Sequence, residues 1–153
     1  MKMNKKGFTL IEMLVVIAII AILVAVVVPA VSNSTIKAKA ATDAANLRSV
    51  QSEINIAHLS SDKTAQVTAS NFTITYTDGK ISAITTTASA PKSETLTGNP
   101  AMTIYYDLQT DSFGVAYSGY SIDDLSKVAN SGTLAAAGTF DATGFDVTSS
   151  AAA

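Results

Sequence analysis

Few residues of this 153-residue chain have side chains that could do chemistry. There is no cysteine, and there is one histidine, His58. Without cysteine the chain has no disulfide, thiol nucleophile or thiolate metal site. A lone histidine gives zinc and general-base arrangements almost nothing to work with, so His58 is expected to be a surface residue or a residue at the C-terminal end of a helix rather than a ligand. No catalytic residue and no cofactor is predicted.

The charged residues do not point to a nucleic acid or a metal. Twelve acidic residues against ten basic ones leave a net charge of −2. This balance gives no electrostatic surface for nucleic acid, so no specific nucleic-acid partner is predicted. Calcium loops need carboxylates in regular alternation. The later aspartates do not follow that alternation, and no metal site is predicted at Asp107, Asp111, Asp123, Asp124, Asp141 or Asp146.

One carboxylate, that of Glu12, lies in an unusual place. It is inside the run 8–31, in which 21 of 24 residues are apolar. As a helix this run measures about 36 Å, enough to cross a hydrocarbon core of about 30 Å. The seven residues before it carry three lysines and no acid. The N-terminus is therefore expected to stay cytoplasmic while the chain beyond Val31 crosses the membrane.

Two ordinary interpretations of this segment are a cleaved secretory signal and a plain membrane anchor. Val28-Pro29-Ala30 is similar to the small-residue site at which secretory signals are cut. However, residues 13–28 are apolar without interruption, which is longer than the roughly 7–15 residues of a secretory signal. An ionisable side chain in a spanning helix is costly and usually functional. Glu12 therefore fits neither interpretation well.

The residues around Glu12 resemble a known family. The sequence Lys5-Lys6-Gly7-Phe8-Thr9-Leu10-Ile11-Glu12, followed by the long apolar run and Pro29, resembles the start of the type IV pilins and pseudopilins. The likeness covers roughly the first fifth of the chain. Its combination of basic leader, glycine, phenylalanine, glutamate and apolar run is highly specific.

The resemblance implies a processing step and an assembly step. A prepilin peptidase would cut between Gly7 and Phe8, and the new Phe8 amine would be methylated. The carboxylate of Glu12 would then pair with the Phe8 amine of a neighbouring subunit in the growing filament. One obligatory ion pair between apolar helices selects a single axial stagger. Pairing within one helix is the competing explanation, because positions i and i+4 are adjacent on a helix.

Pro29 is expected to kink or loosen the helix. It follows three β-branched residues, and a residue directly before proline disfavours the α conformation. The resemblance implies that this stretch can extend in a filament under load. A static proline kink in a membrane helix is the simpler alternative.

Residues 32–60 are expected to continue the helix as an amphipathic half. Apolar positions recur at steps of three and four, at Ile36, Ala40, Ala44, Leu47, Val50 or Gln51, Ile54 and Ala57. Charged side chains, Asp43 among them, are assigned mostly to the outside of that line. Neither glycine nor proline interrupts the pattern, so one helix is predicted from about Phe8 to about Ala57.

The remainder is predicted to form a β-rich head. Alternating residues at 72–76 and 80–84 flank the turn signal Asp78-Gly79, which predicts a hairpin. A second hairpin is predicted from 102–108 and 113–117. Ser121 is expected to cap a short helix from Ile122 to about Ala129, with Gly132 beyond its end.

The side chains of the head give two further expectations. The tyrosines, at strand spacing, are expected to be core or half-buried residues: Tyr76, Tyr105, Tyr106, Tyr117 and Tyr120. The small-residue tail after Thr133 has only Phe140, Phe145 and Val147 as anchors, and about the last five residues are expected to be loose.

Together these observations predict an α+β protein, in which a long N-terminal α-helix, the pilin stem, carries a small antiparallel β-sheet head packed on its C-terminal half. Its segments are a cleaved basic leader, a transmembrane or filament-core half-helix, an amphipathic half-helix and the head, at 1–7, 8–31, 32–60 and 61–153.

The resemblance implies a structural subunit, a major or major-like pilin of an extracellular type IV pilus that supports adhesion or twitching motility. Its implied partners are copies of itself in a helical filament, minor pilins, the prepilin peptidase and the inner-membrane assembly machinery. The cytoplasmic membrane would hold the precursor before assembly. The alternative is a pseudopilin of a type II secretion or DNA-uptake system. An enzyme or binding module on a membrane anchor is a weaker third class, because the head has neither histidine nor cysteine.

Overall fold

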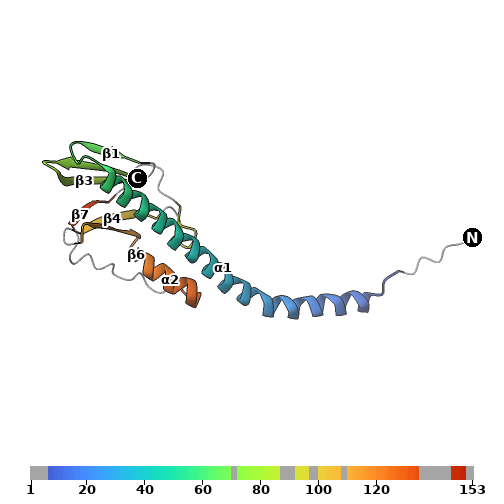
Figure 1. The fold of residues 1–153 in the computed structure, drawn as a ribbon. Coiled ribbons are helices and arrows are strands. Elements are labelled where there is room, and N and C mark those ends of the chain that lie inside the picture. The colour runs from blue at the N-terminus through green and yellow to red at the C-terminus, as the bar shows by residue number, and fades with distance from the viewer. Residues whose placement is uncertain are drawn as a thin grey trace, which may run out of the picture.

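The protein consists of one long helix that carries a small head on its C-terminal half (Figure 1). The computed structural model describes residues 7–69, 72–86, 92–96, 100–107 and 110–134, and the backbone of 146–150. The long helix, α1 (Leu10–Ser60), contains 51 residues, about 77 Å at roughly 1.5 Å per residue. The predicted α+β architecture and the single stem helix are confirmed.

Both ends of α1 have local causes. Thr9 is extended and caps the first turn, and Ser61 is extended again, with φ −77° and ψ 149°. The helix therefore begins two residues later and ends three residues later than the sequence predicts. It runs without a break through Pro29, and its axis changes direction within the blue N-terminal part of the ribbon (Figure 1). A kink at Pro29 itself stays a prediction.

The head contains two antiparallel sheets, where the sequence predicts one. Sheet A has the order β1-β2-β3, from β1 (Gln66–Thr68), β2 (Phe72–Thr77) and β3 (Lys80–Thr86). Sheet B has the order β6-β5-β4-β7, from β4 (Met102–Asp107), β5 (Ser112–Tyr117), β6 (Tyr120–Ser121) and β7 (Asp146–Ser150).

Both predicted hairpins are present. β2 and β3 are joined through Asp78 and Gly79, whose φ angles of 52° and 74° lie in the left-handed region that a two-residue hairpin loop requires. β4 pairs with β5 along its whole length, from Met102 opposite Tyr117 to Asp107 opposite Ser112.

The tail differs from the expectation. Ser149 and Ser150 are expected to be loose, but they pair with Ile104 and Thr103 as part of β7. Val147, one of the expected anchors, lies opposite Tyr105 in the same strand pair. The other two anchors, Phe140 and Phe145, lie outside the described residues. Pairing with a central strand, rather than apolar side chains alone, therefore holds this part of the tail.

The short helix α2 (Ile122–Ser131) confirms the predicted cap and stop. The Asp124 N–H donates to the Ser121 hydroxyl at 3.1 Å, and the Ser121 N–H donates to the Asp124 carboxylate at 3.1 Å. This reciprocal arrangement satisfies two backbone donors at the helix start. Gly132 ends the helix in the left-handed conformation, with φ 76°.

α2 packs against the stem and runs antiparallel to it. Near its middle, Ser126 accepts a hydrogen bond of 3.0 Å from the Arg48 guanidinium. At its end, a Cβ on Gly132 would lie 2.9 Å from Cε of Lys37 and 3.3 Å from the backbone oxygen of Asn33. Glycine therefore allows the end of α2 to approach the stem closely.

The core lies between the amphipathic half of α1 and the two sheets. Its buried apolar residues come from α1, both sheets and α2, and include Ala44, Leu47, Val50, Ile54, Phe72, Ile74, Ile84, Met102, Ile104, Phe113, Val115 and Leu125. Tyr76, Tyr117 and Tyr120 are buried, and Tyr105 and Tyr106 are half-buried. The expectation for the tyrosines is therefore confirmed.

Candidate functional site

The first half of α1 has no cover from the rest of the described chain. Every residue of 8–31 is exposed, and its large apolar side chains have exposed fractions between 47% for Met13 and 83% for Leu10. α1 is long and apolar enough to cross a membrane, by length and composition. So large an apolar surface is unfavourable in water, and it calls for lipid or other subunits around it.

Glu12 is bonded to the start of its own helix. The Thr9 N–H donates to Oε2 of Glu12 at 2.8 Å, and the Thr9 hydroxyl donates to the same oxygen at 2.7 Å. In return the Glu12 N–H donates to the Thr9 hydroxyl at 3.4 Å. This capping box stabilises the first turn. Thr9 is not predicted as a helix cap from the sequence, although Thr-x-x-Glu before an apolar run is a known signal for the start of a helix.

The capping box adds a third arrangement to the two considered for Glu12. In this chain the carboxylate is held by Thr9, and the nitrogen of Phe8 is part of the peptide bond to Gly7 and not a free amine. Both bonds reach Oε2, so a cation that approaches Oε1 need not break them. The carboxylate is thus oriented at the helix start in a position where it can accept a further partner.

The bond between Gly7 and Phe8 is accessible. Both residues precede the helix, in backbone that is neither helix nor strand, and both are exposed. A Cβ added at Gly7 would meet no atom within 4 Å. A peptidase can therefore reach this bond without unwinding α1.

Asp43 is fully buried, and its expected place outside the apolar line of the stem is wrong. Its carboxylate accepts hydrogen bonds from the Ser93 hydroxyl at 2.6 Å, from the Glu94 N–H at 2.7 Å and from the Thr95 N–H at 2.8 Å. Three donors compensate a buried carboxylate for its lost water. Asp43 therefore fastens the loop 92–96 to the stem, which is a structural role.

Asp43 also affects a neighbouring group. Burial, together with the negative charge of Asp43, raises the pKa of Tyr117 to about 12. This tyrosine therefore stays protonated at any physiological pH.

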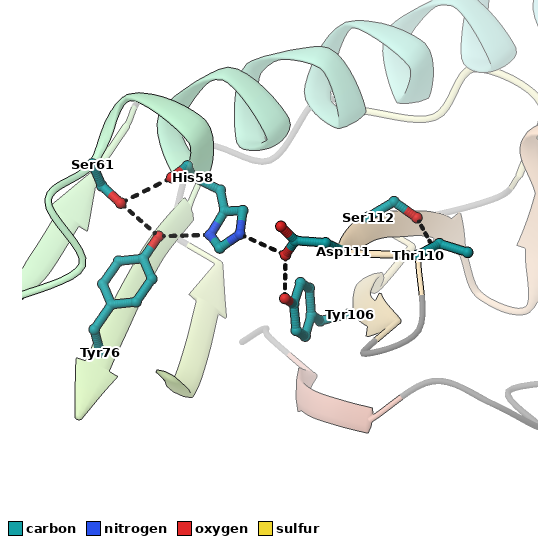
Figure 2. A network of polar contacts seen from close by, with 7 residues as sticks. All are labelled: His58, Ser61, Tyr76, Tyr106, Thr110, Asp111 and Ser112. Atoms are coloured by element: carbon teal, nitrogen blue, oxygen red, sulfur yellow. Dashed lines mark hydrogen bonds and ion pairs between the residues drawn. The ribbon is translucent and has the colours of Figure 1, made fainter. Parts of the chain in front are cut away.

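His58 is buried too. Of the two expected places, the helix end is confirmed, because His58 lies in the last turn of α1, and the surface is wrong. Its exposed fraction is 2%. One ring nitrogen, Nδ1, lies 3.0 Å from the Tyr76 hydroxyl, and the other, Nε2, lies 2.9 Å from Oδ1 of Asp111 (Figure 2). The ring also meets Phe113 edge-on, with centroids 5.3 Å apart. Tyr76 belongs to sheet A, Phe113 belongs to sheet B, and Asp111 lies in the β4–β5 turn of sheet B. His58 therefore joins the end of the stem to both sheets.

Two more hydroxyl groups, those of Tyr106 and Ser61, belong to the polar network around His58. The Tyr106 hydroxyl donates to the same Asp111 oxygen as His58, and the Ser61 hydroxyl lies 3.1 Å from that of Tyr76 (Figure 2). The bonds from Tyr106 and His58 lower the pKa of Asp111, while burial and the contact with Asp111 raise the pKa of Tyr106 to about 12. Its side chains bond one another, as in a structural joint.

The described residues do not gather into a metal site. No group of three or more histidine or acidic side chains lies close enough to hold an ion within these ranges. Asp107 and Asp111 lie near the β4–β5 turn, whereas Asp123 and Asp124 lie in the first turn of α2. Asp141 is outside the described residues, and only the backbone of Asp146 is described.

A comparison with protein families matches the N-terminal segment. Residues 2–28 match a family described as the prokaryotic N-terminal methylation motif. The match contains Gly7, Phe8 and Glu12, and it ends one residue before Pro29. Comparisons with curated proteins and with solved structures gave no match. The family evidence thus concerns the exposed half of α1 and its leader, and the head has to be understood from its own residues.

Proposed function

We propose that this chain, which carries the N-terminal signal of the type IV pilins and pseudopilins, is a major or major-like pilin, the structural subunit of an extracellular type IV pilus. The precursor is held in the cytoplasmic membrane by residues 8–31. A prepilin peptidase cuts it between Gly7 and Phe8, and the Phe8 amine is methylated. The inner-membrane machinery, with minor pilins, then adds it to the fibre.

One observation carries this proposal: an apolar half-helix that the rest of the described chain does not cover extends from the head. In the membrane, lipid covers this half-helix. In a filament, the same surface is covered by the half-helices of other subunits. A contact that repeats head to tail without closing generates a helical fibre, so a single kind of subunit suffices to build it.

Glu12 supplies the register of that fibre. A carboxylate and a methylated amine that both enter an apolar filament core must be paired, because an unpaired buried charge costs several kcal/mol. The capping box already orients Glu12 at the helix start. Its partner is the Phe8 amine of a neighbouring subunit.

Glu12→Gln separates this pairing from helix capping. Glutamine can still accept the hydrogen bonds of Thr9 but carries no charge, so we expect normal membrane insertion and processing but a loss of filaments. Thr9→Ala is the matched control, since it removes the cap and keeps the charge, and it should still give filaments. Electron microscopy of surface fibres measures both. Normal filaments from Glu12→Gln would contradict the proposed pairing.

The mass of the N-terminal peptide from purified surface fibres tests the function itself. A methylated peptide that begins at Phe8 is the expected result. A start at Val31 would indicate a secretory signal, and a start at Met1 an uncut anchor; either result overturns the proposal.

Fibre length separates the pilus from the pseudopilus, which uses the same N-terminal signal. Long fibres on the cell surface support a pilin with a role in adhesion or twitching motility. A short structure confined to the envelope would indicate a pseudopilin of a type II secretion or DNA-uptake system.

A further inference from the structure

One surface of the molecule lies directly beyond the apolar half of α1, where the stem meets the end of α2. We call it the underside of the head; it consists of Ser32, Ile36, Lys37 and Lys39 of the stem and Leu134 of the head. The antiparallel course of α2 places it there. Ser126 of α2 is level with Arg48 of the stem, and Gly132 is against Asn33 and Lys37. The residues that follow α2 therefore reach the stem just beyond Val31, where the apolar run ends.

Leu134 is exposed at this underside. Among the described residues that follow α1, it is the one large apolar side chain with a high exposed fraction, 42%. It lines a hollow of about 450 Å³ together with Ser32 and Ile36 of the stem. A second hollow of about 590 Å³ continues along the apolar half, and Thr35 and Lys39 line both. The exposed leucine is thus continuous with the surface that lipid covers.

The depth of these residues matches the headgroup layer. If the hydrocarbon core ends near Val31, Ser32 and Ile36 lie about 2–8 Å beyond it at roughly 1.5 Å per residue. A bilayer of about 40–45 Å with a core of about 30 Å has headgroup layers of roughly 5–7 Å on each side. Leu134, level with Ser32 and Ile36, therefore lies within the headgroup layer.

The charges of the underside favour an anionic surface. Between Glu12 and Asp43 the stem carries no acid, and its two charged residues are Lys37 and Lys39. Glu94 lines the first hollow beside Lys39, and the buried carboxylate of Asp43 lies behind it, bonded to the amides of Glu94 and Thr95. At the exposed surface the charges are therefore those of two lysines and one acid, Glu94. The acids of α2, Asp123 and Asp124, are in its first turn, at the far end from Gly132. Anionic lipids attract lysines at this level.

We propose that in the membrane-stored precursor the underside of the head docks on the anionic lipid surface, with Leu134 in the interfacial layer and Lys37 and Lys39 at the lipid phosphates. This inference rests on the proposed function in one respect, namely that residues 8–31 span the membrane. The docked head is held beside the membrane in one orientation until the subunit leaves the bilayer.

Single-cysteine labelling of the full chain tests this docking, because the natural sequence has no cysteine. A fluorophore is attached at Thr133→Cys, next to Leu134, and the chain is reconstituted in phosphatidylcholine vesicles with or without phosphatidylglycerol. Some lipids carry a quencher at the top of the acyl chain. We expect strong quenching at position 133 when phosphatidylglycerol is present. A label at Leu59→Cys, at the other end of the head, should stay unquenched.

Two further changes test the residues themselves. Leu134→Ser should abolish the quenching at position 133. Lys37→Gln and Lys39→Gln should each lower the ratio of docked to undocked heads about fivefold. Lys80→Gln, at the start of β3, is the matched control and should change nothing.

A label at Ala18→Cys distinguishes the two proposals. If position 18 is in lipid while position 133 is as accessible to water as position 59, the docking is wrong and the spanning segment stands. If position 18 is itself in water, the spanning segment fails, and with it the proposed storage. Equal quenching with and without phosphatidylglycerol contradicts the role of the lysines. Shielding of position 133 that grows with protein density, without lipid quenching, would assign this surface to a second copy of the chain.

Discussion

The two halves of α1 have the same backbone conformation and opposite surroundings. From Leu10 to Lys39 no side chain is buried, whereas from Ala40 onward one residue in three or four is buried. The second half has an apolar stripe, because it packs against the sheets of its own chain. The first half is apolar on all sides. A stripe thus marks a helix that packs within its chain, and uniform apolarity marks a helix that needs lipid or a neighbour.

Two leucines should separate the halves most clearly. Leu47→Ala empties a fully buried site, and we expect it to lower the free energy of unfolding of the head by roughly 2–5 kcal/mol. Leu23→Ala, in the same helix but 58% exposed, should leave that free energy unchanged. Urea unfolding in detergent micelles, followed by the near-UV circular dichroism of the tyrosines, measures both. Equal effects would contradict the division of α1.

A polar contact of the second half gives the next largest effect. Asp43→Ala leaves the Ser93 hydroxyl and the Glu94 and Thr95 amides without their acceptor. We expect a loss of roughly 1–3 kcal/mol in the same unfolding experiment. The neighbouring Thr42→Ala is the control, because within the described part of the chain the Thr42 hydroxyl bonds back to its own helix, at Ala38. Asp43 would be dispensable if both variants unfolded alike.

The capping boxes of the two helices provide a smaller test. Ser121→Ala removes the cap of α2, which is part of the head, and should cost about 1 kcal/mol of head stability. Thr9→Ala removes the same kind of cap from the free half of α1 and should cost the head nothing. A change in head unfolding with Thr9→Ala would mean that the first half is coupled to the head after all.

The smallest expected effect concerns Asp111, whose carboxylate bonds His58 at the C-terminal end of α1. Hydrogen bonds from Tyr106 and His58 lower the pKa of Asp111 in the folded head. As the pH falls below about 4, the unfolded chain takes up this proton first, so head stability falls until the folded pKa is passed. Asp111→Asn should flatten this acid limb. Glu12→Ala should leave it unchanged, because the bonds of Glu12 are to Thr9.

Local patterns in the sequence predict much of this fold. The apolar run and the three- and four-residue spacing predict α1, and Asp78-Gly79 between alternating residues predicts the first hairpin. Ser121 and Gly132 predict the limits of α2 to within two residues. The N-terminal signal is equally local, since Gly7, Phe8 and Glu12 lie within six positions. Each of these features depends on residues that are close in the sequence.

The missed features depend on distant partners. Asp43 is expected on the surface because it is charged, and only Ser93 and its neighbours, some 50 positions later, make its burial favourable. His58 is likewise compensated by Tyr76 of sheet A and by Asp111 in the β4–β5 turn, 18 and 53 positions later. The separation into two sheets and the pairing of β7 with β4 are also long-range. No local pattern encodes these contacts.

The late position of β7 in the sequence determines when sheet B can be completed during synthesis. β7 lies against both β4 and β3, although Asp146–Ser150 is the last described segment to leave the ribosome. Sheet B therefore cannot close until the chain has emerged to about residue 150. Up to that moment β4 presents an open edge that can pair wrongly, and a chain that stops short of β7 keeps this edge. Completion of sheet B is thus postponed until the last described strand has been synthesised, whereas sheet A, which does not contain β7, can form earlier.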